Sequence, residues 1–405
     1  MKRIGNIFNQ VIEPDNIRLA FWKASRGKRH RPDQREFADN LAVEVERMRC
    51  GLLAGDYPVG RYTRFMIFDP KEREICAAAF PERVLHHALM NVCEPYFERW
   101  LIFDTYACRK GKGQFKAVRR AQVFAGQHEW FLKADVRKFF DSVSHAGLKA
   151  LLRCKFKDER LLTWFDRIID TYETEPGHGL PIGNLTSQYF ANFYLDPLDR
   201  FVKEKLQLKG YVRYMDDFSV WHSSRSEIRN IRKAITNFVT DSLGLELKGE
   251  PYLNRTAHGM DFLGMRVFSD KVDLNRRSMK RFKEKIRRYE WLLATGLMSE
   301  CDFQERVTAL TAFVQQADTE EWRKHFFREP ALNVRIKPLH PWRELEQQRE
   351  QRALRQRELE QPGQRQQQHR VPGCLPLSTI EKLEERMWYP PVSCSLKRDK
   401  ERIAA

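Results

Sequence analysis

The chain has 405 residues and a formal charge of +17 at pH 7, because 72 Lys and Arg outnumber 55 Asp and Glu. This length is enough for two or three domains, and the charge predicts a polyanionic partner, either nucleic acid or an anionic membrane surface. No run of about 18 apolar residues is present, so no membrane-spanning helix is expected. The eight cysteines form no C-x-x-C pair, which argues against a zinc site or a disulfide framework and favours reduced thiols in a cytoplasm.

The first third of the chain is predicted to be mostly helical. Residues 1–60 are expected to form helices around a basic loop, KASRGKRHRP, at 23–32. A second helical stretch is predicted over 82–101, where apolar residues recur at helical spacing. A glycine-punctuated basic loop, ACRKGKGQFKAVRRA, then leads into a helix, and the apolar segment EWFLKAD is predicted to be a strand that ends at Asp135.

The second part of the chain mixes helices with short strands. A helical segment at 145–172 precedes the loop EPGHGLPIGNLTSQ and a helix at 189–206. The stretch GYVRYMDDFSVW predicts a strand, a tight turn and a second strand, because aromatic and β-branched residues flank the turn. A helix near 226–243 and a hairpin strand, MDFLGMRVF, are expected to follow, and 276–335 reads as helical and basic.

The sequence changes character beyond about residue 340. The tract RELEQQREQRALRQRELEQPGQRQQQHR is rich in Gln, Arg and Glu and has few apolar residues. Such a tract cannot bury a core of its own. It is predicted to be either a disordered tail or a lone charged helix.

Two adjacent carboxylates, Asp216 and Asp217, occupy the turn of the predicted hairpin. Like charges at a turn repel each other unless a cation lies between them, although a solvated turn is the simpler interpretation because Asp is common in turns. Asp135 offers a third carboxylate at the end of another strand, with a helix N-cap as its alternative role. Carboxylates from different strands are what a two-metal phosphoryl-transfer site requires, and Mg²⁺ prefers oxygen ligands.

Four blocks, in the order LKADVRKFFDSV, GLPIGNLTSQYFANFYLDPLD, RYMDDF and GMDFLGMRV, resemble the palm of a reverse transcriptase. The resemblance covers about residues 60–270. It implies an α+β right-hand polymerase with fingers, a palm whose antiparallel sheet carries the YMDD hairpin, and an α-helical thumb. The implied domains are a basic helical extension at 1–60, fingers at 61–134, a palm at 135–270 with a fingers-like insertion at about 145–180, a thumb at 271–338 and a tail at 339–405.

The resemblance also implies roles for individual residues. Asp135, Asp216 and Asp217 are implied to be catalytic and to bind two Mg²⁺ ions, for which Mn²⁺ can substitute, with Val136 as a further metal ligand. The residues implied to bind the nucleotide are Arg73, Arg109, Phe140, Ile182, Gly183, Gln188 and Lys248, with Lys71, Lys110 and Lys112 as further cations of the fingers.

Three of these assignments carry specific chemistry. Phe140 falls where the family places an aromatic ring that closes the sugar pocket and selects deoxynucleotides, with ordinary core packing as its alternative role. Lys248 is near the position of a lysine that protonates pyrophosphate, although the local spacing departs from the usual pattern. The segment DFLG at 261–264 resembles the hairpin that grips the primer.

The loop IGNLTSQ at 182–188 departs from the Gln-Gly and Ser-Pro form of most reverse transcriptases. Together with RVLHHALMNVCEPYFERWLIFDTYACRKGKG, it is similar to the reverse transcriptases of diversity-generating retroelements, which copy a template RNA with frequent errors at adenines. This similarity implies a template RNA, a DNA or RNA primer, dNTPs and a small basic accessory variability protein as partners, no membrane, and a cytoplasmic enzyme encoded by a bacterium or a phage.

Ile182 suggests a physical reason for low fidelity. A Gln at this position can hydrogen-bond the incoming nucleotide, whereas an apolar surface discriminates between substrates by only about 1–3 kcal/mol. We therefore hypothesise that Ile182 loosens geometric checking of the nascent base pair. Its alternative role is packing within the loop.

Three other functions compete with this interpretation. The IGNLTSQ loop, and the lack of a His/Cys endonuclease cluster after the thumb, argue against an ordinary-fidelity reverse transcriptase of the group II intron or retron type. The three intact aspartates argue against a catalytically silent RNA-binding protein, and Phe140 argues against a polymerase that makes RNA. His86 and His87 are not expected to share a metal ion, because adjacent helical positions point about 100° apart; packing or a template contact is the preferred interpretation.

Overall fold

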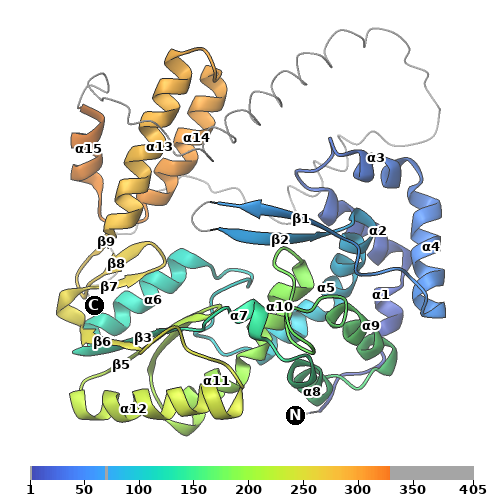
Figure 1. Ribbon diagram of the computed structural model, residues 1–405, viewed down its shortest axis with the longest axis horizontal. Helices are drawn as coiled ribbons and strands as arrows, with labels where there is room; N and C mark the ends of the chain where they lie inside the picture. Colours follow the sequence, from blue (N-terminus) through green and yellow to red (C-terminus); the bar gives the residue numbers. More distant parts are fainter. Residues whose placement is uncertain (1, 69–71, 329–405) are drawn as a thin grey trace, which may run out of the picture. The chain divides into compact units, whose positions relative to one another are not determined.

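The computed structural model describes residues 2–68 and 72–328 of the chain (Figure 1). Within these residues lie a two-stranded, a four-stranded and a three-stranded antiparallel sheet together with many helices. No helix in this part of the chain combines the length and the apolar character that crossing a bilayer requires.

The N-terminal region is helical, as predicted, and packs on a long central helix. Pro is the first residue of two of these helices, a position where its missing N–H costs nothing. Phe21, Phe37 and Phe80 form an aromatic cluster that joins three of the elements. The helices are α1 (Phe8–Val11), α2 (Pro14–Ser25), α3 (Pro32–Asp39), α4 (Leu41–Ala54) and the central α5 (Phe80–Trp100).

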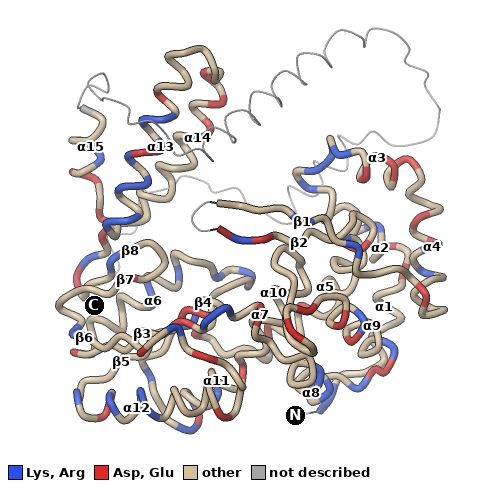
Figure 2. Tube along the Cα trace, in the orientation of Figure 1, with Lys and Arg blue, Asp and Glu red and all other residues tan. Residues whose placement is uncertain are grey.

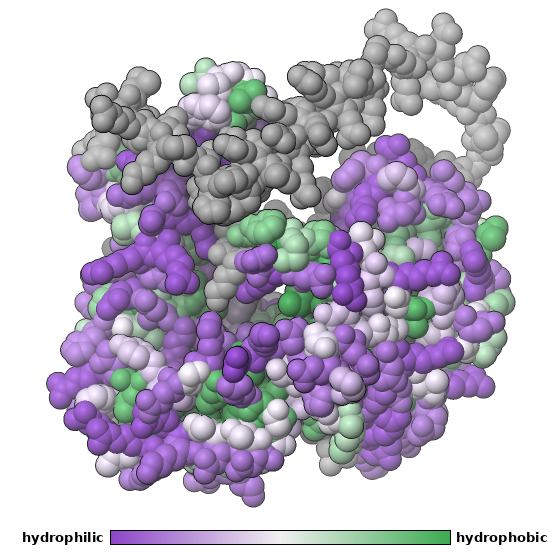
Figure 3. Space-filling view, in the orientation of Figure 1, coloured by the Kyte–Doolittle hydropathy of each residue, from purple (hydrophilic) through white to green (hydrophobic). Residues whose placement is uncertain are grey.

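A β-hairpin that we did not predict connects α4 to α5. Its strands are β1 (Tyr62–Ile67) and β2 (Arg73–Ala78), which pair in antiparallel register. Phe65, Met66 and Phe68 are exposed on it, and Figure 3 shows apolar surface over this hairpin. Because these residues do not alternate between a buried and an exposed face, the strand signal in the sequence is weak.

The four-stranded sheet contains the two segments that we predicted as a strand and a hairpin. Its strand order is β4-β5-β3-β6, with β3 (Trp130–Asp135), β4 (Gly210–Tyr214), β5 (Asp217–His222) and β6 (Tyr252–Arg255). Leu132 and Val220 belong to the apolar cluster on one face of the sheet, whereas Phe131 and Trp221 belong to the cluster on the other. The predicted end of β3 at Asp135 is confirmed.

Helices cover both faces of this sheet. Figure 1 shows α6 (Gln114–Gln127) and α12 (Arg225–Asn237) on opposite sides, and their buried residues belong to the two different clusters. The helix predicted over 189–206 is divided into pieces near Pro197, and the segment predicted over 145–172 is two helices. These elements are α7 (Phe139–Ser142), α8 (His145–Lys155), α9 (Glu159–Ile169), α10 (Leu185–Tyr194), α11 (Asp196–Arg200), η1 (Phe201–Lys205) and η2 (Phe238–Ser242).

The C-terminal part of the described chain is a small sheet followed by helices. The segment predicted as one hairpin strand forms two short strands, with Leu263 and Gly264 in left-handed turn conformations between them. Figure 2 shows Lys and Arg along α13, as its sequence suggests. The elements are η3 (Thr256–His258), β7 (Met260–Phe262), β8 (Met265–Val267), β9 (Val272–Leu274), α13 (Arg276–Ala294), α14 (Glu300–Val314) and α15 (Glu320–Arg328). The end of the predicted thumb and the tail at 339–405 lie outside the described residues.

Candidate active site

Three carboxylates meet at one end of the four-stranded sheet. Asp135 is the last residue of β3, and it pairs in register with Asp217, the first residue of β5. Side chains of directly opposed residues in antiparallel strands have Cβ atoms about 4.5–5.5 Å apart, so like charges there destabilise the sheet. Asp216 precedes Asp217 in the turn, and its carbonyl accepts a hydrogen bond from the Val136 N–H at 3.3 Å. The fold therefore concentrates negative charge at this position.

A buried ion pair stabilises the turn that presents the aspartates. Arg213 and Asp199 are fully buried and lie 2.5 Å apart between Nη2 and Oδ2. Arg213 also donates to the carbonyl of Met215 at 3.0 Å, and Met215 has a left-handed φ of 57°. Asn192 accepts from the same guanidinium, and the Tyr211 hydroxyl donates to Asp199 at 2.7 Å. This network, which sequence reasoning missed, fixes the shape of the hairpin tip.

The carboxylates are electrostatically strained. The pKa of Asp217 is raised to about 6 as the net result of three causes: burial raises it most, Lys133, whose Nζ lies 3.0 Å from Oδ2, lowers it, and the nearby Asp135 and Asp216 raise it. Burial and then Asp135 raise the pKa of Asp216. Oδ1 of Asp217 is buried and has no hydrogen-bond partner.

Several residues that we predicted to bind the nucleotide lie around this cluster. Arg73, at the start of β2, is exposed, and its charge lowers the pKa of Asp216. The Lys248 N–H donates to the carbonyl of Asp135 at 2.7 Å. Phe140 lies in α7, five residues after Asp135, and is half-buried.

The loop at 182–188 docks on the unpredicted hairpin. The carbonyl of Ile182 accepts from the Cys76 N–H at 2.8 Å, and Oδ1 of Asn184 accepts from the Ala78 N–H at 3.2 Å. Gly183 has a φ of +122°, and a Cβ there would lie 2.8 Å from Cγ2 of Ile75. Only glycine fits this close approach, so β2 sets the position of the loop.

Residues 70–267 match the family model described as reverse transcriptase (RNA-dependent DNA polymerase). These residues form a reverse transcriptase domain within the chain. The match supports nucleotidyltransferase activity of the RNA-directed DNA polymerase class for this domain. The predicted α+β reverse transcriptase fold, with an antiparallel sheet that carries the YMDD hairpin, is confirmed.

Curated relatives of the reverse transcriptase domain include intron-encoded proteins. Protein YkfC of Escherichia coli is 24% identical over 276 residues, which are 56% of this chain and 72% of YkfC. The group II intron-encoded protein LtrA of Lactococcus lactis is 23% identical over 215 residues, 50% of this chain and 35% of LtrA. Among solved structures, telomerase from Candida tropicalis with a TWJ fragment of telomeric RNA aligns with a TM-score of 0.41 and 12% identity, over 66% of this chain and 55% of that one.

The carboxylates of the reverse transcriptase domain fit a divalent cation. Within the described residues, no three or more His, Cys, Asp or Glu side chains are already arranged as a metal site, and Asp217 is instead directed to Lys133. However, a buried carboxylate oxygen without a partner, beside two further carboxylates of the same charge, is the donor set that a hard cation neutralises.

Other predicted residues have different partners in the reverse transcriptase domain. The Arg109 guanidinium donates to the Glu98 carboxylate at 2.9 Å and to three main-chain carbonyls, so it braces the loop before α6 and does not extend toward the aspartates. Lys110 pairs with Glu94, and Lys112 donates to the carbonyl of Phe103. Gln188 accepts from Cys108 at 3.5 Å, and Lys71 lies outside the described residues.

Proposed function

We propose that this protein is an RNA-directed DNA polymerase that extends a primer along a template RNA, using dNTPs and two divalent ions. The observation that carries the proposal is the registered pairing of Asp135 with Asp217, with Asp216 adjacent, inside a reverse transcriptase domain. Carboxylates that oppose each other across a sheet are costly to a fold, and a two-metal site gives that cost a function.

The residues divide the work of nucleotidyl transfer among them. Asp135, Asp216 and Asp217, with the main chain of Val136, would hold Mg²⁺ or Mn²⁺. When bound, such ions activate the attacking hydroxyl and neutralise charge on the leaving pyrophosphate. Arg73 supplies a cation for the triphosphate.

The remaining residues are proposed to contact the sugar of the nucleotide and the leaving pyrophosphate. Phe140 closes the sugar pocket against a 2′-hydroxyl, and the close packing of Gly183 on β2 positions the loop beside it. Lys248, whose main-chain N–H donates to the carbonyl of Asp135, would donate a proton to the pyrophosphate. In this proposal residues 61–134 form the fingers, 135–270 the palm and 271–338 the thumb, whose cations grip the template–primer backbone.

We further propose that copying is error-prone at template adenines, as in diversity-generating retroelements. The support is the IGNLTSQ loop, in which Ile182 offers the nucleotide no side-chain hydrogen bond while its carbonyl is tied to Cys76. In this function the product cDNA carries clustered substitutions, and a small basic accessory protein assists the enzyme in a bacterial or phage-infected cytoplasm.

A second candidate is an ordinary-fidelity reverse transcriptase of the group II intron type. The relatives favour it, because LtrA and a putative COX1/OXI3 intron 2 protein of Saccharomyces cerevisiae, 19% identical over 249 residues, are both intron proteins. The two candidates share the chemistry and differ in fidelity.

Primer extension on a defined RNA template separates these functions. The wild-type protein with Mg²⁺ and dNTPs is expected to make cDNA, and Asp216→Asn is expected to make none. Sequencing of every product then decides the subgroup: errors concentrated opposite adenines support the retroelement function, and low, even errors support the intron type. Ile182→Gln should reduce adenine errors, and an unchanged error spectrum would refute the role of Ile182.

A further inference from the structure

Lys133 joins two parts of the reverse transcriptase domain that are far apart in the chain. It lies in the middle of β3, and its side chain is 25% exposed. Its Nζ atom is 3.0 Å from Oδ2 of Asp217 and donates a hydrogen bond at 2.9 Å to the carbonyl of Asp261, 128 positions further along the chain. One ammonium group therefore connects the carboxylate cluster to the DFLG turn at 261–264.

The main chain that accepts this bond lies at the edge of a sheet. The three-stranded sheet has the order β7-β8-β9, so β8 pairs with only one side of β7. The other side of an edge strand presents main-chain groups that need partners of their own. Lys133 provides one for the carbonyl of Asp261, and Nε2 of Gln114 provides another for the carbonyl of Leu263 at 2.8 Å. Two side chains from outside the small sheet thus fix the main chain of the turn.

Apolar packing brings this turn to the four-stranded sheet but does not orient it. Phe262 and Met265 are buried in the same cluster as Phe131. Phe131 and Lys133 are two positions apart on β3, so they share one face of the sheet. Hydrophobic attraction has no preferred direction, whereas a hydrogen bond from a charged donor is directional and strong. The position of the turn relative to Asp217 therefore depends on the bond from Lys133.

The same ammonium takes the place of a cation at the carboxylates. It neutralises Oδ2 of Asp217, whereas Oδ1 is buried and has no partner. A divalent ion held by Asp135, Asp216 and Asp217 would bring a second positive charge close to Lys133, and like charges repel. The ion would compete with the ammonium for Asp217, and the carbonyl of Asp261 would remain as the partner of Lys133.

We propose that Lys133 is a positioning residue that couples cation binding at the carboxylates to the position of the DFLG turn. Without a cation, its ammonium is shared between Asp217 and the carbonyl of Asp261. With a cation bound, the ammonium binds the Asp261 carbonyl alone and holds the turn in place. The inference rests on the proposed polymerase, in which this turn contacts the primer, and it means that the metal site and the primer end become ordered together.

Mn²⁺ binding to the full-length protein, without RNA or nucleotide, tests the competition. Electron paramagnetic resonance measures the unbound ion during a titration. Lys133→Met should bind Mn²⁺ about fivefold more tightly than the wild type, which is the upper range for an ion pair near a protein surface. The control, Lys271→Met, removes the same charge from the exposed pair with Asp273 and should bind as the wild type does. An unchanged affinity in Lys133→Met would overturn the competition.

Hydrogen–deuterium exchange followed by mass spectrometry tests the coupling at β7 and β8. Saturating Mn²⁺ should slow amide exchange in these strands of the wild type and of Lys271→Met. In Lys133→Met the exchange should be faster from the start and should not respond to Mn²⁺, because the ammonium that transmits the effect is absent. A response of wild-type size in Lys133→Met would overturn the positioning role, even if the affinity for Mn²⁺ had changed.

Two further variants separate the effect of the ammonium from an effect on the fold. Lys133→Arg keeps the charge and the hydrogen-bond donors, so it should retain the response of β7 and β8 to Mn²⁺. Lys133→Gln removes the charge but keeps a polar side chain, and it replaces Lys133→Met in both assays if that variant does not fold. A Lys133→Arg protein that behaves as Lys133→Met does would overturn the role of the charge.

Primer extension distinguishes this inference from the proposed function. Lys133→Met should lower kcat by about 10–100-fold and leave KM for the dNTP nearly unchanged, because misplacement of the primer end slows the chemical step. A raised KM with an unchanged kcat would overturn the link to the primer. A wild-type protein that makes no cDNA but shows the Mn²⁺ response at β7 and β8 would refute the polymerase and leave the coupling standing.

Discussion

Asp199 in helix α11 and the three aspartates at the end of the four-stranded sheet have opposite surroundings. Asp199 is fully buried, and each of its carboxylate oxygens has a partner, from Arg213, Tyr211 and Thr105. Asp217 lies at the sheet end among like charges, and one of its oxygens has no partner. A carboxylate that stabilises a fold has hydrogen-bond partners for both oxygens within the protein, whereas one that binds a ligand lacks a partner until the ligand binds.

This difference has a thermodynamic meaning. The Asp199–Arg213 pair offsets its own desolvation through many hydrogen bonds, and it keeps the turn at Met215 in its left-handed shape. The carboxylates of Asp135, Asp216 and Asp217 subtract from stability until a cation arrives. The sheet therefore combines a rigid base with a tip whose free energy depends on its ligand, and substitutions in the two groups should have effects of opposite sign.

The largest effect is expected from breaking the buried pair. Asp199→Asn should lower the free energy of unfolding by about 3–5 kcal/mol, because Arg213 then remains charged and buried without compensation. Urea unfolding followed by circular dichroism measures the change. The double variant Asp199→Leu/Arg213→Met should lose less than the sum of the two single changes, and a loss under 1 kcal/mol in Asp199→Asn would contradict the comparison.

A substitution in the other group should stabilise the metal-free protein. Asp217→Asn at pH 8 in EDTA should raise the free energy of unfolding by about 1–3 kcal/mol, since each unit of pKa shift corresponds to about 1.4 kcal/mol and the loss of the ion pair with Lys133 offsets part of the gain. The same variant should abolish cDNA synthesis. Asp261→Asn, at an exposed carboxylate of β7, is the control and should change stability little.

The pH dependence gives the sign of this effect. The folded pKa of Asp217, about 6, lies above its ordinary value of 3.8, so the folded state binds the proton more tightly than the unfolded state. Its contribution to stability is therefore fully present below pH 3.8 and is lost as the pH rises to about 6. Urea unfolding in EDTA across this range should show a falling contribution in the wild type that Asp217→Asn lacks, and equal slopes would contradict it.

A smaller gain is expected from the metal. Mg²⁺ at ten times its dissociation constant should stabilise the wild-type protein by about 1.4 kcal/mol, because it binds only the folded state. Thermal unfolding with and without Mg²⁺ measures this gain, with added KCl to match ionic strength. Asp216→Asn should show no comparable gain, and an equal response in both proteins would place the bound ion elsewhere.

The smallest effect is expected at an exposed pair near the site. Arg137 and Glu246 form an ion pair beside Asp135, with side chains 57% and 68% exposed. Arg137→Gln should change the free energy of unfolding by about 0–1 kcal/mol, as exposed pairs do. A change of 3 kcal/mol in urea unfolding would mean that proximity to the sheet end, and not burial, determines how much a charged residue contributes to the free energy of unfolding.

Local patterns predicted the parts of this molecule that depend on neighbouring residues. The hairpin at 210–222 and the strand that ends at Asp135 follow from aromatic and β-branched residues beside a turn. The hairpin of β1 and β2 was missed because its first strand is exposed on both faces. A strand that buries neither face leaves no period-2 signal to read.

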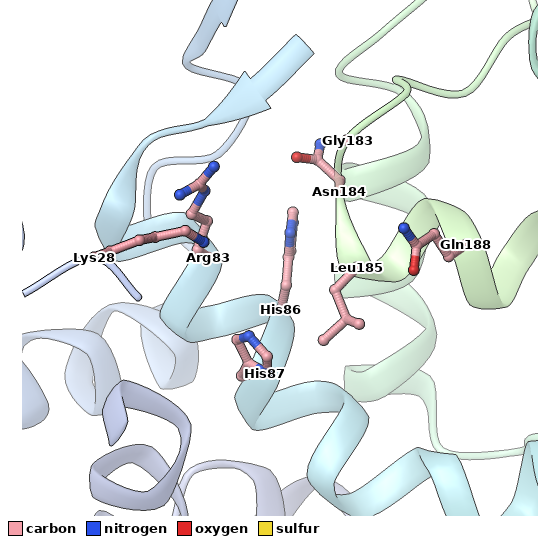
Figure 4. Close-up of a pocket in the computed structure, with 8 residues that line it drawn as sticks. All are labelled: Lys28, Arg83, His86, His87, Gly183, Asn184, Leu185 and Gln188. Atoms are coloured by element: carbon pink, nitrogen blue, oxygen red, sulfur yellow. The ribbon is translucent and has the colours of Figure 1, made fainter. Parts of the chain in front are cut away.

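Contacts between residues that lie far apart in the chain could not be predicted from local sequence patterns. Asp199 stands in a helical segment, LDPLDR, where an acidic residue is usually solvated, and nothing local indicates that it meets Arg213 in the core. The pocket in Figure 4 likewise joins residue 28 to residues 83–87 and 183–188. For Arg109, the sequence predicted a contact that the fold does not make. The basic loop around it suggested a cation available to the nucleotide, whereas the guanidinium donates to main-chain carbonyls.

The registered pairing of Asp135 with Asp217 has a consequence for how this sequence can change. Side chains alternate along a strand, so Asp135 and Asp217 share the sheet face of Phe131 and Trp221, and Leu132 and Val220 fill the other. Deleting one residue within β3 or β5 would exchange the two faces and turn a carboxylate into the core. The odd-numbered positions of β3 and β5 therefore carry the aspartates, and the even-numbered positions fill the core on the other face. A point substitution changes one of these sets, whereas an insertion or deletion within a strand changes both at once.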